Sequence, residues 1–230
     1  MKFFKALKQF LLKYKHGLVL SYFFIYMAWF TYLERTVTSN FTIIHSRLDD
    51  LIPFNEWFAI PYFLWFVYIA VTVVYFLFTS KNDFYKYCAF LFIGMTICLI
   101  IYTIFPNGQD LRVDVNSLGR HNIMIDIMSK LYKIDTDTNV FPSIHAYNSI
   151  GAYIAIRKSE KLHSKKWLQR SSLILTILIC MSTVFLKQHS VLDVFGACVL
   201  SIVMYTLVYV PDWTKVFKPE KQPELSKVRR

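Results

Sequence analysis

Apolar residues are concentrated in six runs along the chain, and polar or charged segments separate these runs. Several runs approach the roughly 20 residues with which an α-helix crosses the hydrocarbon core of a bilayer. They are Leu18–Leu33, Phe58–Phe78, Tyr87–Phe105, Phe141–Ile156, Leu173–Leu186 and Val191–Val210. The first, fourth and fifth runs are short, so we expect flanking residues or neighbouring helices to complete them. The pattern predicts an all-α, polytopic membrane protein with six transmembrane helices. A soluble all-α protein with buried helices is the alternative that hydropathy disfavours.

The composition agrees with this prediction. Of the 230 residues, 55% are hydrophobic and 18% are aromatic. A soluble domain of this length would not usually hold so many long apolar runs. No small-residue cleavage site follows the first run, so we expect this run to be retained as a membrane span. The four cysteines form no CxxC pair, which favours apolar packing over a zinc site or a disulfide framework.

The net charge of +11 is unevenly distributed along the sequence. Basic residues dominate residues 1–17, the segment Arg157–Arg170 and the tail 211–230, whereas Phe105–Val140 is mixed. With six spans, the three basic segments fall on one side of the membrane, which predicts cytoplasmic termini. We expect residence in a membrane, most simply the plasma membrane. The positive charge is concentrated in the segments on one side of the membrane, which explains it without nucleic-acid binding. We therefore expect a lipid phosphate substrate and membrane lipids as partners, and no nucleic acid.

Three regions follow from this organisation. Residues 1–17 form a basic, amphipathic pattern suited to the membrane surface, although a solvated lead-in fits equally well. Residues 18–210 form the six-span membrane domain, and residues 211–230 form a basic cytoplasmic tail. Within the longest outer loop, Ile123–Tyr132 has the apolar spacing of a short surface helix.

The predicted topology brings three residues to the outer face of the helix bundle. His145 begins the fourth span, His189 lies between the fifth and sixth spans, and Arg112 lies in the long outer loop. Ionisable residues at membrane depth are functional candidates by default. We therefore expect an active site at this outer face.

His189 and Asp193 are four residues apart, which places both on one face if the segment is helical. An aspartate that accepts from one imidazole nitrogen leaves the other nitrogen free as a nucleophile or base. His145 could then protonate a leaving oxygen. Ordinary polar contacts remain the alternative for the His–Asp pair. Ser143 could simply cap its helix, or the same helix start could bind an anion.

These residues resemble the signature of the type 2 phosphatidic acid phosphatase superfamily of membrane enzymes. That signature has a Lys-x6-Arg-Pro motif, a Pro-Ser-x-His motif and a Ser-Arg-x5-His-x3-Asp motif. Pro142–His145 matches the second motif. Ser182–Asp193, "STVFLKQHSVLD", carries Ser, His and Asp at the spacing of the third motif, while the first motif survives only as Arg112.

The sequence departs from the signature at phosphate-binding positions. Phe105 and Thr183 replace the expected Lys and Arg, and Val113 replaces the expected Pro. Lys187 could supply one charge from a neighbouring position. Loss of these cations is also similar to the sphingomyelin synthase and inositol phosphorylceramide synthase branch. A phosphodiester carries less charge than a phosphomonoester and needs fewer cations.

The resemblance implies a lipid phosphatase that hydrolyses a phospholipid or isoprenoid phosphate. In it, His189 attacks phosphorus, Asp193 orients His189 and His145 protonates the leaving alcohol. Arg112, Ser143 and Lys187 would bind the phosphoryl oxygens. A phosphohistidine intermediate then passes to water, and no metal or other cofactor is implied. Transfer of a lipid head group to an alcohol acceptor is the first alternative. A non-catalytic transporter or lipid-binding scaffold is the second, while a haloperoxidase is disfavoured by the missing cations and the membrane-embedded chain.

Overall fold

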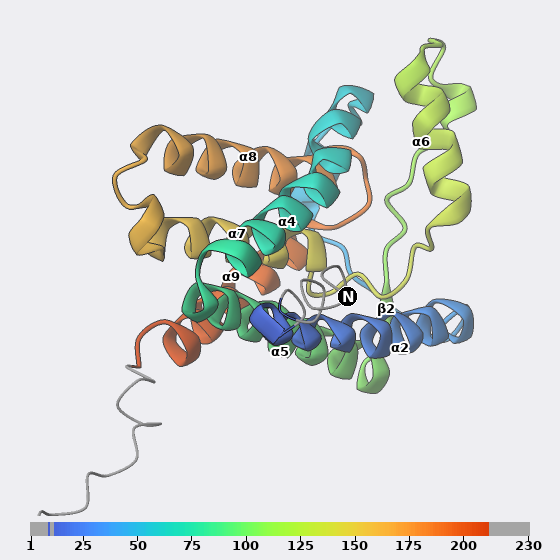
Figure 1. Ribbon diagram of the computed structural model, residues 1–230. Coiled ribbons are helices and arrows are strands. Elements are labelled where there is room, and N and C mark those ends of the chain that lie inside the picture. Colours follow the sequence, from blue (N-terminus) through green and yellow to red (C-terminus); the bar gives the residue numbers. More distant parts are fainter. Residues whose placement is uncertain (1–8, 10–11, 212–230) are drawn as a thin grey trace, which may run out of the picture.

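The computed structural model describes residue 9 and residues 12–211, and the chain is mostly helical (Figure 1). Most of the predicted surface segment 1–17 and all of the predicted tail beyond residue 211 lie outside the described residues. The helices follow the predicted apolar runs closely. They are α2 (Tyr22–Thr36), which continues the 3₁₀ helix η1 (Lys15–Ser21), α4 (Ala59–Thr79), α5 (Lys81–Ile104), α7 (Ile144–Lys158), α8 (Lys166–Phe185) and α9 (Val191–Val208).

Five helical segments of the described chain are long and apolar enough to cross a membrane. They are Lys15–Thr36, Glu56–Thr79, Lys81–Ile104, Lys166–Phe185 and Val191–Val208. These five correspond to the first, second, third, fifth and sixth predicted spans. The fourth predicted span, α7, has 15 residues and is not among them, so the six-span topology remains a prediction.

Helix α8 begins at Lys166 rather than at Leu173, so flanking residues complete the short fifth run, as expected. The basic segment Arg157–Arg170 therefore includes the end of α7, a short connection with the 3₁₀ helix η4 (Glu160–Leu162), and the start of α8. Lys, Trp, Leu, Gln and Arg contain no helix breaker, so the helix continues through its charged first turns.

Helix α7 occupies the centre of the bundle and packs against α4, α5, α8 and α9. Its buried positions include small and polar residues, namely Ala146, Asn148, Ser149, Gly151, Ala152 and Ala155. At 1.5 Å per residue its 15 residues extend about 22 Å, which is short of a bilayer core. Because the surrounding helices cover it, α7 does not need a fully apolar surface of its own.

Close approach of α5 and α7 depends on Gly94. The Tyr147 hydroxyl of α7 donates to the backbone carbonyl of Phe90 on α5 at 2.6 Å. A Cβ atom on Gly94 would overlap the Tyr147 ring and hydroxyl. The glycine therefore leaves the space in which Tyr147, fully buried, joins the two helices.

Short elements cover one end of the bundle. They comprise α3 (Arg47–Leu51), the 3₁₀ helices η2 (Glu56–Phe58) and η3 (Val115–Ser117), the parallel pair β1 (Thr42–Ile43) and β2 (Asn107–Gly108), and α6 (Ile123–Ile134). The predicted helix at Ile123–Tyr132 is thereby confirmed as α6. Asn122 begins α6 by accepting backbone N–H bonds from Met124 and Ile125.

Buried Asn107 fixes the chain that leads into α7. Its Oδ1 accepts the backbone N–H groups of Val140 and Phe141 at 2.9 and 2.7 Å. Its Nδ2 donates to the carbonyl of Phe105 at 2.8 Å. The start of α7 is therefore fastened to the end of α5, and this contact positions Ser143 and His145.

Candidate active site

His189 and Asp193 are joined at the start of α9. Ser190 is the N-cap of this helix, and its backbone N–H donates to Asp193 Oδ2 at 2.9 Å in a capping box. His189 Nδ1–H donates to the same carboxylate oxygen at 3.1 Å, and both residues are buried. His189 therefore precedes the helix, and the contact arises from the cap rather than from one face of a helix as the spacing predicted.

The connection between α8 and α9 is a tight, ordered turn. The backbone N–H groups of Gln188 and His189 both donate to the carbonyl of Thr183 at 3.0 Å. Lys187 takes a φ of 52°, in the left-handed region that few non-glycine residues adopt. Thr183 directs its own hydroxyl to the carbonyl of Cys180 at 2.8 Å. The position that holds an Arg in the related motif thus serves to close the turn that presents His189.

His145 lies opposite His189, with the two ring centroids 5.7 Å apart. It is the second residue of α7, and its ring packs against Trp65 and Tyr62 of α4 at 4.4 and 4.8 Å between centroids. The backbone N–H of Ser143 donates to the carbonyl of Asp193 at 3.1 Å, which ties the starts of α7 and α9 together. The structure therefore brings His145, His189 and Asp193 into one site.

Ser143 is the N-cap of α7. Its hydroxyl oxygen accepts the backbone N–H of Ala146 at 3.3 Å, and the residue is fully buried. The Tyr102 hydroxyl donates to the preceding carbonyl of Pro142 at 2.6 Å. Capping is thus an observed role of Ser143, and it orients the first turn of the helix that carries His145.

Arg112 is held by backbone carbonyls at the end of α6. Its Nη1 donates to the carbonyls of Tyr132 and Asp135, at 3.1 and 3.0 Å. Its Nη2 donates to the carbonyl of Thr136 at 2.5 Å and to Gln188 Oε1 at 2.9 Å. Only its Nε, which is buried, lacks a hydrogen-bond partner. Arg112 lies beside the turn that carries His189, but most of its donors are already engaged.

Lys187 is also turned toward the protein. Its Nζ donates to the backbone carbonyl of Asp49 at 2.7 Å, and only 7% of the residue is exposed. Burial lowers the pKa of the Lys187 ammonium, while Asp49 and Asp50 act in the opposite direction. Lys187 thus lies in the turn that carries His189, but its ammonium group is bound to the protein backbone and does not point into solvent.

Asp49 is a buried member of the site region that the sequence analysis missed. Its Oδ2 accepts the Ser190 hydroxyl at 2.6 Å, and its Oδ1 accepts the backbone N–H of Val191 at 2.8 Å. The same carboxylate accepts the backbone N–H of Ser46 at 2.8 Å, which starts α3. Asp49 thus joins the first outer loop to the start of α9. The sequence signal was a Ser-x-x-Asp capping box at Ser46–Asp49.

Asp135 adds an acidic group near the histidines. Its Oδ2 accepts from Gln188 Nε2 at 3.1 Å and lies 4.0 Å from Arg112 Nη2. Burial raises the pKa of this carboxyl to about 6, although the Arg112 guanidinium and His189 both lower it. Desolvation of the carboxyl is the largest influence on this pKa.

Residues 118–216 match the model of the PAP2 superfamily, which confirms the predicted resemblance to the type 2 phosphatidic acid phosphatase superfamily. The matched segment contains Ser143, His145, Lys187, His189 and Asp193, whereas Arg112 precedes it. No curated protein and no solved structure matches the chain significantly. The match supports a phosphatase-type activity and leaves the substrate open.

Proposed function

We propose, on the premise of the PAP2 superfamily match, that this chain is an integral-membrane lipid phosphatase acting through a phosphohistidine intermediate. The observation that carries the proposal is the pairing of two histidine rings 5.7 Å apart, one of which donates Nδ1–H to a buried carboxylate. With Nδ1 protonated, the lone pair of His189 lies on Nε2, the nitrogen available for attack.

In the first step, His189 Nε2 attacks phosphorus and the bond to the lipid oxygen breaks. Asp193 holds the ring and stabilises the positive charge that develops on it. His145, as an imidazolium, gives a proton to the departing alcohol. In the second step, neutral His145 takes a proton from water, which attacks the phosphohistidine and releases phosphate. Both histidines return to their starting states.

Transfer of a phosphoryl-linked head group to an alcohol is a second candidate that one observation favours. Arg112 and Lys187 both direct their donors to backbone carbonyls. A phosphomonoester dianion would call for more free cations than this arrangement offers. A phosphodiester carries a single negative charge, and an acceptor hydroxyl would take the place of water in the second step.

Two substrates distinguish these candidates. The purified protein would receive a phosphatidate-type monoester and, separately, a phosphodiester lipid together with an alcohol acceptor. We expect phosphate release from the monoester. Head-group exchange without phosphate release would instead establish the transferase, and no turnover of either substrate would favour a non-catalytic scaffold.

His189→Ala identifies the nucleophile in the same assay. We expect turnover to be lost while the protein elutes and unfolds like the native chain. His121→Ala is the matched control, because His121 is exposed and its ring lies 3.1 Å from Asp126, away from the candidate site. Undiminished turnover in His189→Ala would remove His189 from the mechanism.

A further inference from the structure

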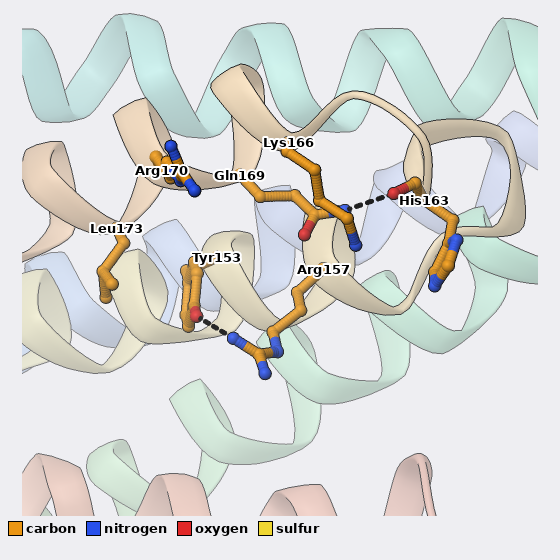
Figure 2. Close-up of a pocket in the computed structure, with 7 residues that line it drawn as sticks. All are labelled: Tyr153, Arg157, His163, Lys166, Gln169, Arg170 and Leu173. Carbon is orange, nitrogen blue, oxygen red and sulfur yellow. Dashed lines mark hydrogen bonds between the residues drawn. The ribbon is translucent and has the colours of Figure 1, made fainter.

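A basic cavity lies where α7 ends and α8 begins (Figure 2). Its volume is about 330 Å³. The lining residues are Tyr153 and Arg157 of α7, His163 of the connection, and Lys166, Gln169, Arg170 and Leu173 of α8. His145 and Arg157 are separated by 12 residues of one helix, or about 18 Å at 1.5 Å per residue. The cavity is therefore distinct from the candidate active site.

The cavity carries three permanent positive charges, and none of its lining residues is acidic. Arg157 Nη1 donates to the Tyr153 hydroxyl at 2.8 Å, which holds the guanidinium at the cavity (Figure 2). Among the described residues, the Lys166 and Arg170 side chains have no hydrogen-bond or ion-pair partner. Cations that share a cavity without a counterion repel one another, and an anion bound between them would relieve this repulsion.

The side chains of α8 change from basic to apolar with distance from the start of the helix. Lys166, Arg170 and Leu173 follow one another at helical spacings of four and three residues, so they share one face. Farther along the same candidate span, Ile174 and Ile177 are 59% and 49% exposed. Trp167, at the start of the helix, is 68% exposed, as is typical of an aromatic residue at a membrane interface.

We propose that this cavity binds the phosphate-bearing head group of an anionic membrane phospholipid. The planar fork of an arginine suits two phosphate oxygens, and the lysine adds a compact charge. An acyl chain would continue past Leu173 along the apolar part of α8. Basic pockets between helices at a cytoplasmic surface are suited to such head groups. The assignment fits the predicted cytoplasmic position of this end of the bundle.

Native mass spectrometry of the full chain in detergent tests this assignment, with phosphatidylglycerol as the probe and phosphatidylcholine as the uncharged comparison. We expect specific phosphatidylglycerol adducts on the native protein. The triple variant R157Q/K166Q/R170Q should lose about tenfold or more of this binding, since each removed charge weakens attraction to an anionic lipid. Arg170→Gln alone should also weaken binding, and we expect this variant to fold, because Arg170 is exposed and forms no side-chain hydrogen bond or ion pair within the part of the chain that the structure describes.

The matched control is K158Q/K161Q/K165Q, which removes the same charge from neighbouring positions outside the cavity lining. It should retain phosphatidylglycerol binding. Equal losses in the two triple variants would overturn the proposal, because the attraction would then be a diffuse surface effect. Binding of inorganic phosphate as tightly as phosphatidylglycerol would also overturn it. The cavity would then recognise phosphate alone, and the lipid part of the ligand would add no affinity.

Discussion

Asp193 uses a single carboxylate oxygen for two purposes. Oδ2 accepts the backbone N–H of Ser190, which starts α9, and Nδ1–H of His189, which sets the tautomer of the ring. The same oxygen atom therefore caps helix α9 and holds the His189 ring. This sharing fixes the His189 ring relative to the helix start and, through the Ser143 N–H bond to the Asp193 carbonyl, relative to α7.

Asp193→Asn should lower turnover far more than it lowers stability. The amide oxygen can still accept the Ser190 N–H, but a neutral amide cannot stabilise an imidazolium at His189. We expect kcat to fall by about 100-fold or more with KM little changed. Steady-state kinetics on the phosphatidate-type monoester measures this. Asp126→Asn, at an exposed position of α6, is the control, and equal kcat values in the two variants would contradict the proposed role.

Asp135 should make stability depend on pH. Burial raises the pKa of its carboxyl to about 6 in the folded chain, above the ordinary value of 3.8, despite Arg112 and His189 nearby. The folded state therefore binds more protons than the unfolded state between these values, and stability declines as pH rises through this window. Glu34, also close enough to raise this pKa, contributes in the same direction.

The neutral variant Asp135→Asn isolates this contribution. Near pH 4 the native carboxyl is protonated in the folded state, so the two proteins should melt at similar temperatures. At pH 7 the native carboxylate is charged and partly desolvated, so the variant should have the higher melting temperature. Thermal unfolding in detergent across pH 4–7 measures the difference, and a constant difference would show that Asp135 does not titrate in this range.

At the residue scale, the sequence predicted which residues meet but not what each one contacts. The spacing of His189 and Asp193 and the shared end of the bundle were enough to bring His145 to them. The contacts of Arg112 were not predictable, because they depend on how the end of α6 folds back toward Gln188. Asp49 was missed because its partners, Ser190 and Val191, lie about 140 residues away in the sequence.

At the scale of elements, the site depends on a short helix far from it in sequence. The start of α3 and the start of α9 are both capping boxes, and Asp49 belongs to the first while it binds Ser190 of the second. The Lys187 ammonium bond to the Asp49 carbonyl reinforces the same junction. Asp49 therefore acts as a positioning residue for the His189 turn.

Asp49→Asn should weaken both stability and turnover. The amide retains one acceptor where the carboxylate had two, so at least one of the Ser46, Ser190 and Val191 donors is left without a partner. Such a loss costs about 1–3 kcal/mol in a buried site. Thermal unfolding and kcat are the two measurements. Asp50→Asn is the neighbouring control, since Asp50 is exposed and its hydrogen bond is to the exposed His45, at 2.8 Å, and it should leave both nearly unchanged.

Hydropathy predicted the ends of helices correctly where the helix is apolar along its whole length. Helices α4, α5 and α9 agree with the predicted runs to within a few residues, apart from the start of α5. There, Ser80 ends one helix and caps the next, so α5 includes the segment Lys81–Lys86, whose charged and amide residues a hydropathy pattern excludes. Helix α8 also begins before its apolar run, at Lys166, although its N-cap Lys165 makes no side-chain capping bond. There the helix propensity of the first residues extends the helix beyond its apolar part.

On the scale of the whole molecule, the two ends of the bundle differ in chemistry. One end contains His145, His189 and Asp193, together with the side chains of Asp49, Asp135 and Gln188. The other end gathers Arg157, Lys166 and Arg170 around the basic cavity. Helix α7 reaches from one end to the other, since its second residue faces His189 and its fourteenth lines the cavity with the start of α8. This geometry supports the prediction that α7 crosses the same layer as α8.

Cysteine labelling in sealed vesicles tests whether α7 crosses the membrane. In a variant without the four native cysteines, Lys130→Cys on α6 and Lys165→Cys before α8 would each carry one exposed label site. If α7 crosses, a membrane-impermeant maleimide added outside should modify only one of the two, and solubilisation should expose the other. Modification of both from the same side would mean that α7 does not cross. The number of spans would then be five, and the termini would lie on opposite sides.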